Sequence, residues 1–304
     1  MPASARGGVL TIGNFDGVHV GHQRIVAAAR RRADEAGVAA VAMTFEPPPV
    51  AVLRPDQAPR RIVPADVKCR LLRDAGADWV VVATAEPRLL RLEPGDFIDE
   101  VIVGRFAPRA LVEGPDFSFG RRRRGNVTML AEAGAAAGFE VHVAEPVSVE
   151  LPGGARPVSS TLIRELVRDG RVEEAARCLG RDFALHGRVV GGQRVGRALE
   201  FPTANLDAGD QVIPGDGVYA GRAEVAGQRF VAAVSIGTKP TLHDAPGAPR
   251  VIEAFLLDAA GDYYDETMVL TFVRRVRGQE RFESVEVLKA KIAEDVARVR
   301  NICG

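Results

Sequence analysis

The hydrophobic period of this chain of 304 residues changes once, close to residue 183. Before that point, short runs that are apolar on both faces alternate with stretches of helical spacing, which is typical of βαβ units and a parallel sheet. After it, short runs are separated by Gly, Pro and Asp, as in an antiparallel barrel or sandwich. The sequence therefore predicts an α/β domain over residues 1–183 and an all-β domain over residues 184–304, an ordinary length for two domains.

The expected elements of the first domain follow this alternation, and several of the expected helices end at a glycine. Because ligands of open parallel sheets bind outside the carboxyl ends of the strands, we expect the binding crevice at that edge. The predicted strands span residues 9–12, 38–45, 79–83, 110–112 and 139–143, and the predicted helices span 22–36, 64–75, 95–106, 126–137 and 161–180, the last interrupted at Gly170.

The second domain is expected to end with a helix that packs on the barrel. Ser284 can cap the start of this helix, and apolar residues recur after it at intervals of three or four positions. They are Val285, Leu288, Ile292, Val296 and Val299.

The charge balance argues against a nucleic-acid-binding domain. The chain has 40 basic and 40 acidic residues; residues 1–183 hold 25 and 24 of them, which leaves 15 and 16 in residues 184–304. A domain that binds nucleic acid through its overall field carries a clear basic excess, and neither half does. Arg30–Arg32 and Arg121–Arg124 leave RNA binding as a minor alternative, since such runs usually lie in solvated loops.

The cysteines and the apolar runs indicate a reduced, soluble, cytoplasmic protein. Cys69, Cys178 and Cys303 are far apart and form no C-x-x-C, so we expect neither a disulfide framework nor a zinc ribbon. No apolar run approaches the ~20 residues that span a bilayer, and the N-terminus lacks the apolar stretch of a signal peptide. We therefore expect no membrane partner.

Several common nucleotide and hydrolase motifs are missing from the sequence. None of the four lysines follows a glycine, which excludes a P-loop, and H-E-x-x-H, G-x-S-x-G and G-x-G-x-x-G do not occur. A nucleotide site in this chain must use other residues.

The most informative stretch is Gly13-Asn-Phe-Asp-Gly-Val-His19-Val-Gly-His22, between the first expected strand and helix. Its glycines let the backbone approach a bulky ligand, and the start of the helix offers unpaired N–H groups to an anion. His19 and His22 could donate hydrogen bonds to phosphate oxygens there. Two of the five histidines lie here, which favours a nucleotide site over a solvated turn. The predicted catalytic residues are His19 and His22, and the predicted nucleotide contacts are Gly13, Asn14, Phe15, Asp16 and Gly17.

Hydroxyl groups gather again where the helix over residues 161–180 is expected to begin. Ser159, Ser160 and Thr161 lie at its start, and Arg164 follows one turn later. Donors in this arrangement suit the oxygens of a phosphate group. Simple capping of the helix is the alternative role, and it is the more common one for a Ser-Ser-Thr sequence taken alone.

The first stretch resembles the H-x-G-H signature of the nucleotidyltransferase superfamily. The wider string G-N-F-D-G-V-H-x-G-H resembles the FMN adenylyltransferase module of the bifunctional riboflavin kinase/FMN adenylyltransferase family. Three further segments match that module in order: Thr44-Phe-Glu-Pro47, Gly114-Pro-Asp-Phe-Ser-Phe-Gly120 with the arginines after it, and Val158-Ser-Ser-Thr161-Leu-Ile-Arg164. The resemblance implies a Rossmann-like nucleotidyltransferase sheet and nucleotide contacts by Asp116, Ser160, Thr161 and Arg164.

Phe201-Pro-Thr-Ala-Asn205 and the upstream Gly191-Gly-Gln-Arg-Val-Gly-Arg197 resemble the riboflavin kinase domain, an antiparallel β-barrel. If this piece is extended, Thr203 and Asn205 project from the same side, and their oxygens suit Mg²⁺; a proline-led turn with an Asx cap is the alternative. The resemblance implies Glu253 as the catalytic base, nucleotide contacts by Gly191, Gly196 and Arg197, and flavin contacts by Phe201 and Arg277.

The resemblance extends from residue 8 to about residue 300, with three departures from the family's pattern. Glu200 replaces the glycine usual before F-P-T-A-N, Pro48 stands where a histidine is frequent, and residues 84–87 lack the usual aromatic-Asp pair. The implied function is phosphorylation of riboflavin to FMN by ATP, then adenylylation of FMN to FAD with release of pyrophosphate. The implied partners are ATP, riboflavin, FMN and FAD, with Mg²⁺ as cofactor. A nucleotidyltransferase with another acceptor and a non-catalytic barrel remains an alternative.

Overall fold

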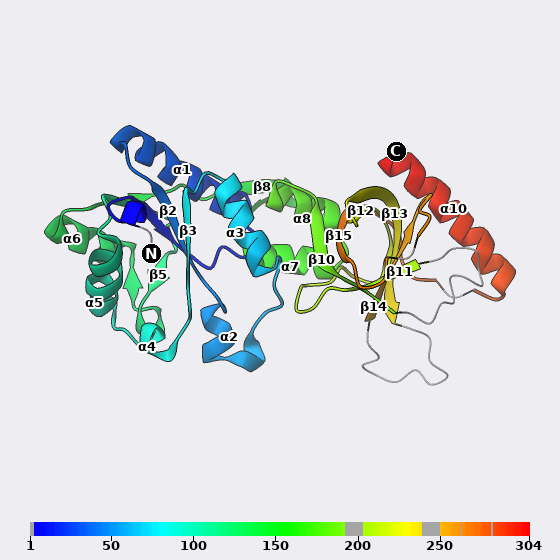
Figure 1. Ribbon diagram of the computed structural model, residues 1–304, viewed down its shortest axis with the longest axis horizontal. Coiled ribbons are helices and arrows are strands. Elements are labelled where there is room, and N and C mark those ends of the chain that lie inside the picture. The colour runs from blue at the N-terminus through cyan, green and yellow to red at the C-terminus, as the bar shows by residue number, and fades with distance from the viewer. Residues whose placement is uncertain (1–2, 192–202, 239–249, 262, 281) are drawn as a thin grey trace. The chain divides into compact units, whose positions relative to one another are not determined.

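The computed structural model describes residues 3–191, 203–238, 250–261, 263–280 and 282–304 (Figure 1). Contacts divide the chain into two compact units, Met1–Arg60 with Pro64–Ser159 and Arg61–Val63 with Ser160–Gly304. The period of the sequence changes at residue 183, whereas the contacts group the helices that follow Ser159 with the barrel.

The first unit is built on a five-stranded parallel sheet with the strand order β3-β2-β1-β4-β7. The chain adds β2 and β3 on one side of β1 and then β4 and β7 on the other. The order therefore reverses between β1 and β4, which is where ligands of such sheets bind. The strands are β1 (Val9–Ile12), β2 (Ala40–Phe45), β3 (Trp79–Ala83), β4 (Ala110–Glu113) and β7 (Glu140–Val143).

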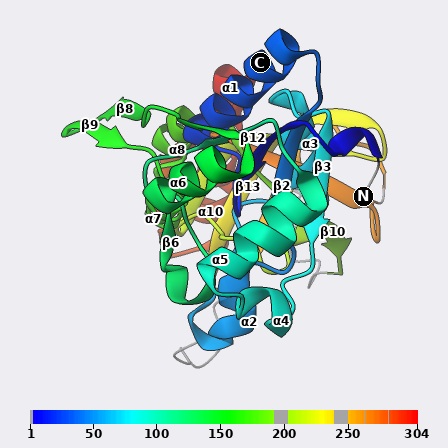
Figure 2. The ribbon, with the colours of Figure 1, turned by 90° about the vertical axis from the view of Figure 1, so that its left-hand side faces the viewer.

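The predicted parallel sheet with helices is confirmed, and helices cover both of its faces. α1 and α3 pack on one face, where Ala33 and Leu72 are completely buried. The π-helical segment η3, which continues directly from α5 (Pro94–Asp96), and helix α6 pack on the other face (Figure 2). There Phe97 and Leu130 join an apolar cluster with Leu111. The bounds are α1 (Val20–Ala36), α3 (Ala65–Asp74), η3 (Phe97–Phe106) and α6 (Val127–Ala137).

Shorter elements connect these layers. β8 (Ser148–Leu151) and β9 (Gly154–Pro157) form a hairpin that projects from the unit in Figure 2. The others are η1 (Ala3–Ala5), α2 (Pro49–Leu53), η2 (Pro55–Gln57), α4 (Pro87–Leu90), α5 (Pro94–Asp96), β5 (Ser118–Phe119), η4 (Arg121–Arg123) and β6 (Gly125–Asn126).

The second unit contains a closed antiparallel barrel with the strand order β10-β11-β14-β13-β12-β15. Alternate residues point inward; Ile252, Ala254 and Leu256 of β14 are buried, whereas Glu253 and Phe255 between them are half-buried. This confirms the predicted all-β fold. The strands are β10 (Phe183–Val190), β11 (Thr203–Asp207), β12 (Gly217–Val225), β13 (Gln228–Thr238), β14 (Arg250–Leu256) and β15 (Thr267–Arg277).

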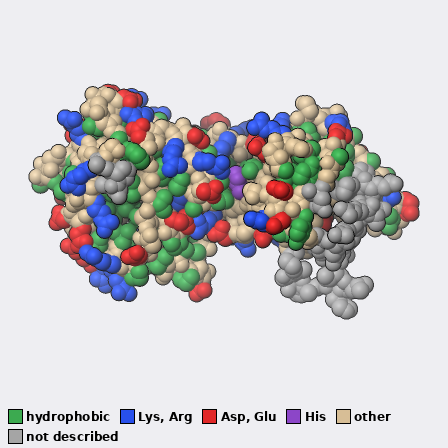
Figure 3. Space-filling view, viewed as in Figure 1, with side chains coloured by type: hydrophobic (Ala, Val, Ile, Leu, Met, Phe, Trp, Pro, Cys, Tyr) green, Lys and Arg blue, Asp and Glu red, His purple; other side chains and the backbone are tan. Residues whose placement is uncertain are grey.

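Among the described residues of the second unit, three helices accompany the barrel: α7 (Ser160–Arg168), α8 (Val172–Leu179) and α10 (Val285–Cys303). The predicted final helix is confirmed, because the Ser284 hydroxyl accepts a hydrogen bond from the Val287 N–H at 3.3 Å and α10 packs on β12, β13 and β15. In the described part of the chain, no helix combines the length and apolar character needed to cross a membrane. The face in Figure 3 carries interspersed basic and acidic side chains, as the charge balance predicts.

Candidate active sites

The loop between β1 and α1 has a strained backbone. Phe15 and Val18 adopt φ values of 48° and 40°, in the left-handed region that a β-branched residue such as valine very rarely occupies. Both side chains are buried in the apolar cluster that includes Leu72 of α3. Packing therefore holds a backbone conformation that is unfavourable by itself, and such strain is found mainly at functional sites.

His19 caps the start of α1. Its Nδ1 accepts a hydrogen bond from the His22 N–H at 3.3 Å, so the proton of the neutral ring lies on Nε2. The His19 and His22 rings stack with their centroids 3.6 Å apart. The structure thus brings the two predicted histidines together at the start of α1.

His22 is held in its neutral form. Burial, together with the nearby His19 ring, lowers the pKa of His22 well below its ordinary value. Its Nδ1 has no hydrogen-bond partner among the described residues, and its ring makes a T-shaped contact with Phe15 at 5.2 Å between centroids. An uncharged His22 can both donate and accept one hydrogen bond.

Side chains of β2 and α3 support this loop. The Thr44 hydroxyl donates to the Asn14 carbonyl at 3.2 Å. The ammonium group of the buried Lys68 donates to the Phe45 carbonyl at 3.0 Å and lies 3.6 Å from the Glu46 carboxylate. The sequence did not indicate a role for Lys68. The feature that could have pointed to its burial is its position on the helix face that carries Val67 and Leu72. Asn14 and Asp116, both predicted nucleotide contacts, are exposed.

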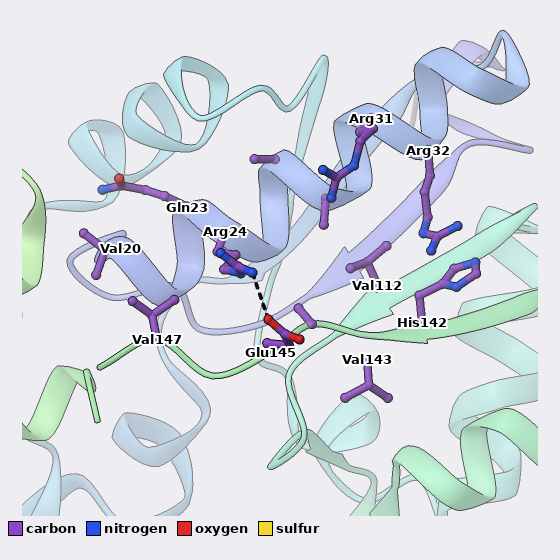
Figure 4. A pocket seen from close by; sticks show the side chains of 13 residues that line it. Val20, Gln23, Arg24, Arg31, Arg32, Val112, His142, Val143, Glu145 and Val147 are labelled. Carbon is purple, nitrogen blue, oxygen red and sulfur yellow. Dashed lines mark hydrogen bonds and ion pairs between the residues drawn. The ribbon is translucent and has the colours of Figure 1, made fainter. Parts of the chain in front are cut away.

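A groove of about 720 Å³ runs beside α1 (Figure 4). α1 contributes Gln23 and three arginines, Arg24, Arg31 and Arg32, and the opposite wall is formed by β4, β7 and the segment after β7. Arg24 forms an ion pair of 3.0 Å with Glu145 across the groove. The volume lies in the range of small-molecule sites, and the groove borders the carboxyl ends of β4 and β7.

The predicted residues around Ser160 begin α7, in the second unit. Ser160 is half-buried, Thr161 is exposed and Arg164 is 9 % exposed. In the arginine run, Arg121 and Arg124 contact Glu93 at 3.1 and 3.6 Å.

Register on the barrel brings Thr203, Asn205 and Glu253 to one surface. Asn205 of β11 pairs with Glu253 of β14, and Thr203 pairs with Phe255. Directly paired residues on antiparallel strands project to the same side with their Cβ atoms about 5 Å apart. Because Ala254 points into the barrel, all three predicted residues lie on its outer surface. Ser235 of β13 pairs with Glu253 from the other side.

The donor set on this surface fits a hard cation. Asn205 is 6 % exposed, and its Oδ1 is buried without a hydrogen-bond partner among the described residues. An amide oxygen that lacks a donor costs free energy unless something else binds it. Together with the Thr203 hydroxyl, it offers the neutral oxygen ligands that Mg²⁺ accepts alongside phosphate oxygens.

Arg277 is tied to the final helix. Its guanidinium binds the buried Asp295 of α10 with N–O distances of 2.7 and 2.9 Å and stacks over the Phe282 ring. Gln279 donates to the Ser235 hydroxyl and the Ile236 carbonyl, which holds this segment beside β13. Gly191 is exposed at the end of β10, whereas Gly196, Arg197 and Phe201 lie outside the described residues.

Comparisons with known proteins assign both halves of the chain to one bifunctional family. The family model for FAD synthetase matches residues 1–162, and the model for riboflavin kinase matches residues 179–303. The bifunctional riboflavin kinase/FMN adenylyltransferase of Pseudomonas fluorescens is 39% identical over 97% of this chain and 93% of its own length. The chain belongs to this family. The family, the two-part fold and the bifunctional activity predicted from the sequence are confirmed.

One further relative carries the same family name, and one solved structure shares the fold. The bifunctional enzyme of Escherichia coli K12 is 35% identical over 99% of this chain and 95% of its own length. A crystal structure described as a macrolide-efflux protein from Streptococcus pneumoniae is 29% identical, with a TM-score of 0.86 over 97% of this chain and 94% of that one.

Proposed function

We propose that the two reactions of this family use separate residues of the chain. The enzyme is a riboflavin kinase and FMN adenylyltransferase, which converts riboflavin to FMN and FMN to FAD. We assign adenylyl transfer to residues 1–183 and kinase chemistry to residues 184–304. The observation that carries this proposal is the β11–β14 register, which supports one phosphate-transfer surface made entirely of barrel residues.

The kinase step needs a base, because the hydroxyl group of riboflavin is a poor nucleophile. We assign this role to Glu253, which accepts the hydroxyl proton while the hydroxyl oxygen bonds to the γ-phosphorus of ATP and the bond to ADP breaks. Thr203 Oγ1 and Asn205 Oδ1 would hold Mg²⁺, which neutralises phosphate charge when bound. The proposed nucleotide contacts are Gly191, Gly196 and Arg197, and the proposed flavin contacts are Phe201 and Arg277.

The adenylyl step needs no base, because the attacking phosphate of FMN is already an anion. Its oxygen bonds to the α-phosphorus of ATP, and pyrophosphate leaves. His19 Nε2, His22 and the N–H groups at the start of α1 donate to phosphate oxygens, which stabilises the charge in the transition state. The groove beside α1 has the size to hold a nucleoside. The other proposed nucleotide contacts are Gly13, Asn14, Phe15, Asp16, Gly17, Asp116, Ser160, Thr161 and Arg164.

The partners follow from this chemistry. ATP, riboflavin, FMN and FAD are the proposed ligands, in the cytoplasm, with Mg²⁺ and without nucleic acid. Arg121 and Arg124 are already engaged by Glu93, and Arg30 pairs with Asp34 and Asp78, so the arginine runs give little support to RNA binding.

Separation of flavins after incubation tests the proposal. With riboflavin and Mg-ATP, we expect FMN to rise first and FAD to follow; with FMN and Mg-ATP, FAD should form directly. Formation of FAD from FMN without phosphorylation of riboflavin would mean that the barrel is not catalytic. No product from either flavin would favour a nucleotidyltransferase with another acceptor.

A further inference from the structure

A buried carboxyl group occupies the point where β1 and β4 separate. The two strands pair at Val9–Ala110 and Leu10–Leu111. Beyond these pairs, the Ile12 N–H donates to Oε1 of Glu113 at 2.7 Å. On its other side β1 continues its ladder, since the Gly13 N–H donates to the Met43 carbonyl. The Glu113 side chain therefore replaces the backbone acceptor that the diverging strand β4 no longer offers.

The position of Glu113 connects two loops. Ile12 directly precedes the loop Gly13–Gly17, and Glu113 directly precedes the segment Gly114–Gly120 that carries Asp116. The hydrogen bond between them joins the bases of both loops at the place where the strand order reverses. A substrate bound outside the carboxyl edge of the sheet would meet both loops.

We propose that Glu113 is a positioning residue of the adenylyltransferase site, which holds the Gly13–Gly17 and Gly114–Gly120 loops in register through its bond to Ile12. This inference rests on the function proposed above for the first unit. Glu113 acts through the backbone and is not itself expected to touch the reacting atoms.

The surroundings of Glu113 favour its neutral form. The side chain is 2 % exposed and shares the sheet face of Leu111, which packs with Phe97 and Phe119. Burial raises the pKa of Glu113 well above its ordinary value, and the hydrogen bond from Ile12 opposes this only in part. A neutral carboxyl still accepts the hydrogen bond from the Ile12 N–H, and it does not repel a polyphosphate. Ionisation at high pH would add a buried negative charge at the base of the Gly13–Gly17 loop.

The other ionisable groups near β4 lie outside the buried environment of Glu113. His142 of β7 pairs with Val112, so it lies on the sheet face opposite to Glu113. Helix α1, which carries His22 and Arg24, covers that opposite face. Glu140 of β7 is exposed. On the face of Glu113, the ionisable residues of η3 and of the loop after β4 are exposed; they are Asp99, Glu100, Arg105 and Asp116.

Two substitutions at this position test the proposal with the full-length enzyme. Glu113→Gln keeps an oxygen acceptor for Ile12 but cannot ionise, and Glu113→Leu removes the acceptor. Adenylylation of FMN is measured from pH 6 to 10 with kcat and the KM for ATP, while phosphorylation of riboflavin by the same chain reports on its integrity. Glu140→Gln, at an exposed glutamate of the same sheet, is the matched control.

We expect Glu113→Leu to lower kcat/KM for adenylylation about 10- to 100-fold, the effect of an unpaired buried N–H, with kinase activity unchanged. We expect the wild type to lose adenylylation activity at alkaline pH, and Glu113→Gln should keep neutral-pH activity without that decline. Wild-type adenylylation by Glu113→Leu, or an unaltered alkaline decline in Glu113→Gln, would overturn the proposal. If Glu113→Leu does not fold, the Glu113→Gln profile decides. A wild-type enzyme without adenylylation would instead refute the proposed function.

Discussion

The first unit gathers its candidate site at the ends of parallel strands, whereas the barrel carries its candidate site on the outer surface of antiparallel strands. In the first unit, buried groups and a strained backbone set the geometry: His22 and Glu113 have shifted pKa values because they are buried. On the barrel, the register of β11 and β14 brings the buried Asn205 and the half-buried Glu253 together directly. The geometry of the first site depends on loops that buried side chains hold in place, and the geometry of the barrel site depends on strand pairing.

This difference agrees with the chemistry of the two reactions. An anionic phosphate attacks in adenylyl transfer, so neutral donors that bind phosphate are sufficient. A hydroxyl group attacks in the kinase reaction, so a carboxylate with access to solvent is useful as a base. The comparison predicts that single substitutions should remove one activity and spare the other.

The largest effect is expected for Glu253→Gln. Loss of a general base should lower phosphorylation of riboflavin about 10²- to 10⁴-fold, while adenylylation of supplied FMN stays at the wild-type rate. Steady-state assays with each flavin measure both activities. Glu224→Gln, at an exposed glutamate of β12, should change neither. Equal loss of both activities in Glu253→Gln would mean a folding defect.

Two substitutions of His19 separate its roles as helix cap and phosphate donor. His19→Ala should destabilise the enzyme by about 1 kcal/mol, because the cap of α1 is lost, and lower adenylylation about 10²- to 10³-fold. His19→Asp restores a cap acceptor but repels phosphate, so stability should recover while adenylylation stays low. Chemical denaturation and FAD formation from FMN measure the two effects. Recovery of activity along with stability in His19→Asp would show that His19 only caps the helix.

The smallest effect is expected for Asn205→Ala, which removes one oxygen of the proposed magnesium site. The Mg²⁺ concentration that gives half-maximal kinase activity should rise about tenfold, equivalent to ~1.4 kcal/mol. Chelation of divalent cations should abolish the kinase activity of both proteins. Asn301→Ala, at an exposed asparagine of α10, is the control. An unchanged magnesium titration in Asn205→Ala would remove Asn205 from the metal site.

The sequence predicted much of this comparison, because the two periods reflect two different strand environments. The strands Val9–Ile12 and Trp79–Ala83 have the predicted bounds, and Ser284 caps the final helix as expected. β4 extends one residue further than predicted, to Glu113, because an isolated carboxylate after an apolar run resembles the start of a loop.

The details of the two sites could not be derived from the pattern. The pairing of Asn205 with Glu253 depends on a register between strands far apart in the chain, which local periodicity does not contain. The role of Glu113 depends on the divergence of β1 and β4, and no sequence motif marks the point where these strands diverge. The polar hairpin β8–β9 was missed because its strands lack an apolar run.

A mixing experiment tests the central claim, two separable sites, most directly. Glu253→Gln and His19→Asp are each incubated with riboflavin and Mg-ATP, alone and together, and the flavins are separated over time. We predict almost no flavin nucleotide from Glu253→Gln alone, FMN without FAD from His19→Asp alone, and FAD from the mixture, because free FMN passes from one protein to the other. A mixture that makes no more FAD than either variant alone, although Glu253→Gln adenylylates added FMN, would contradict two sites linked by free FMN.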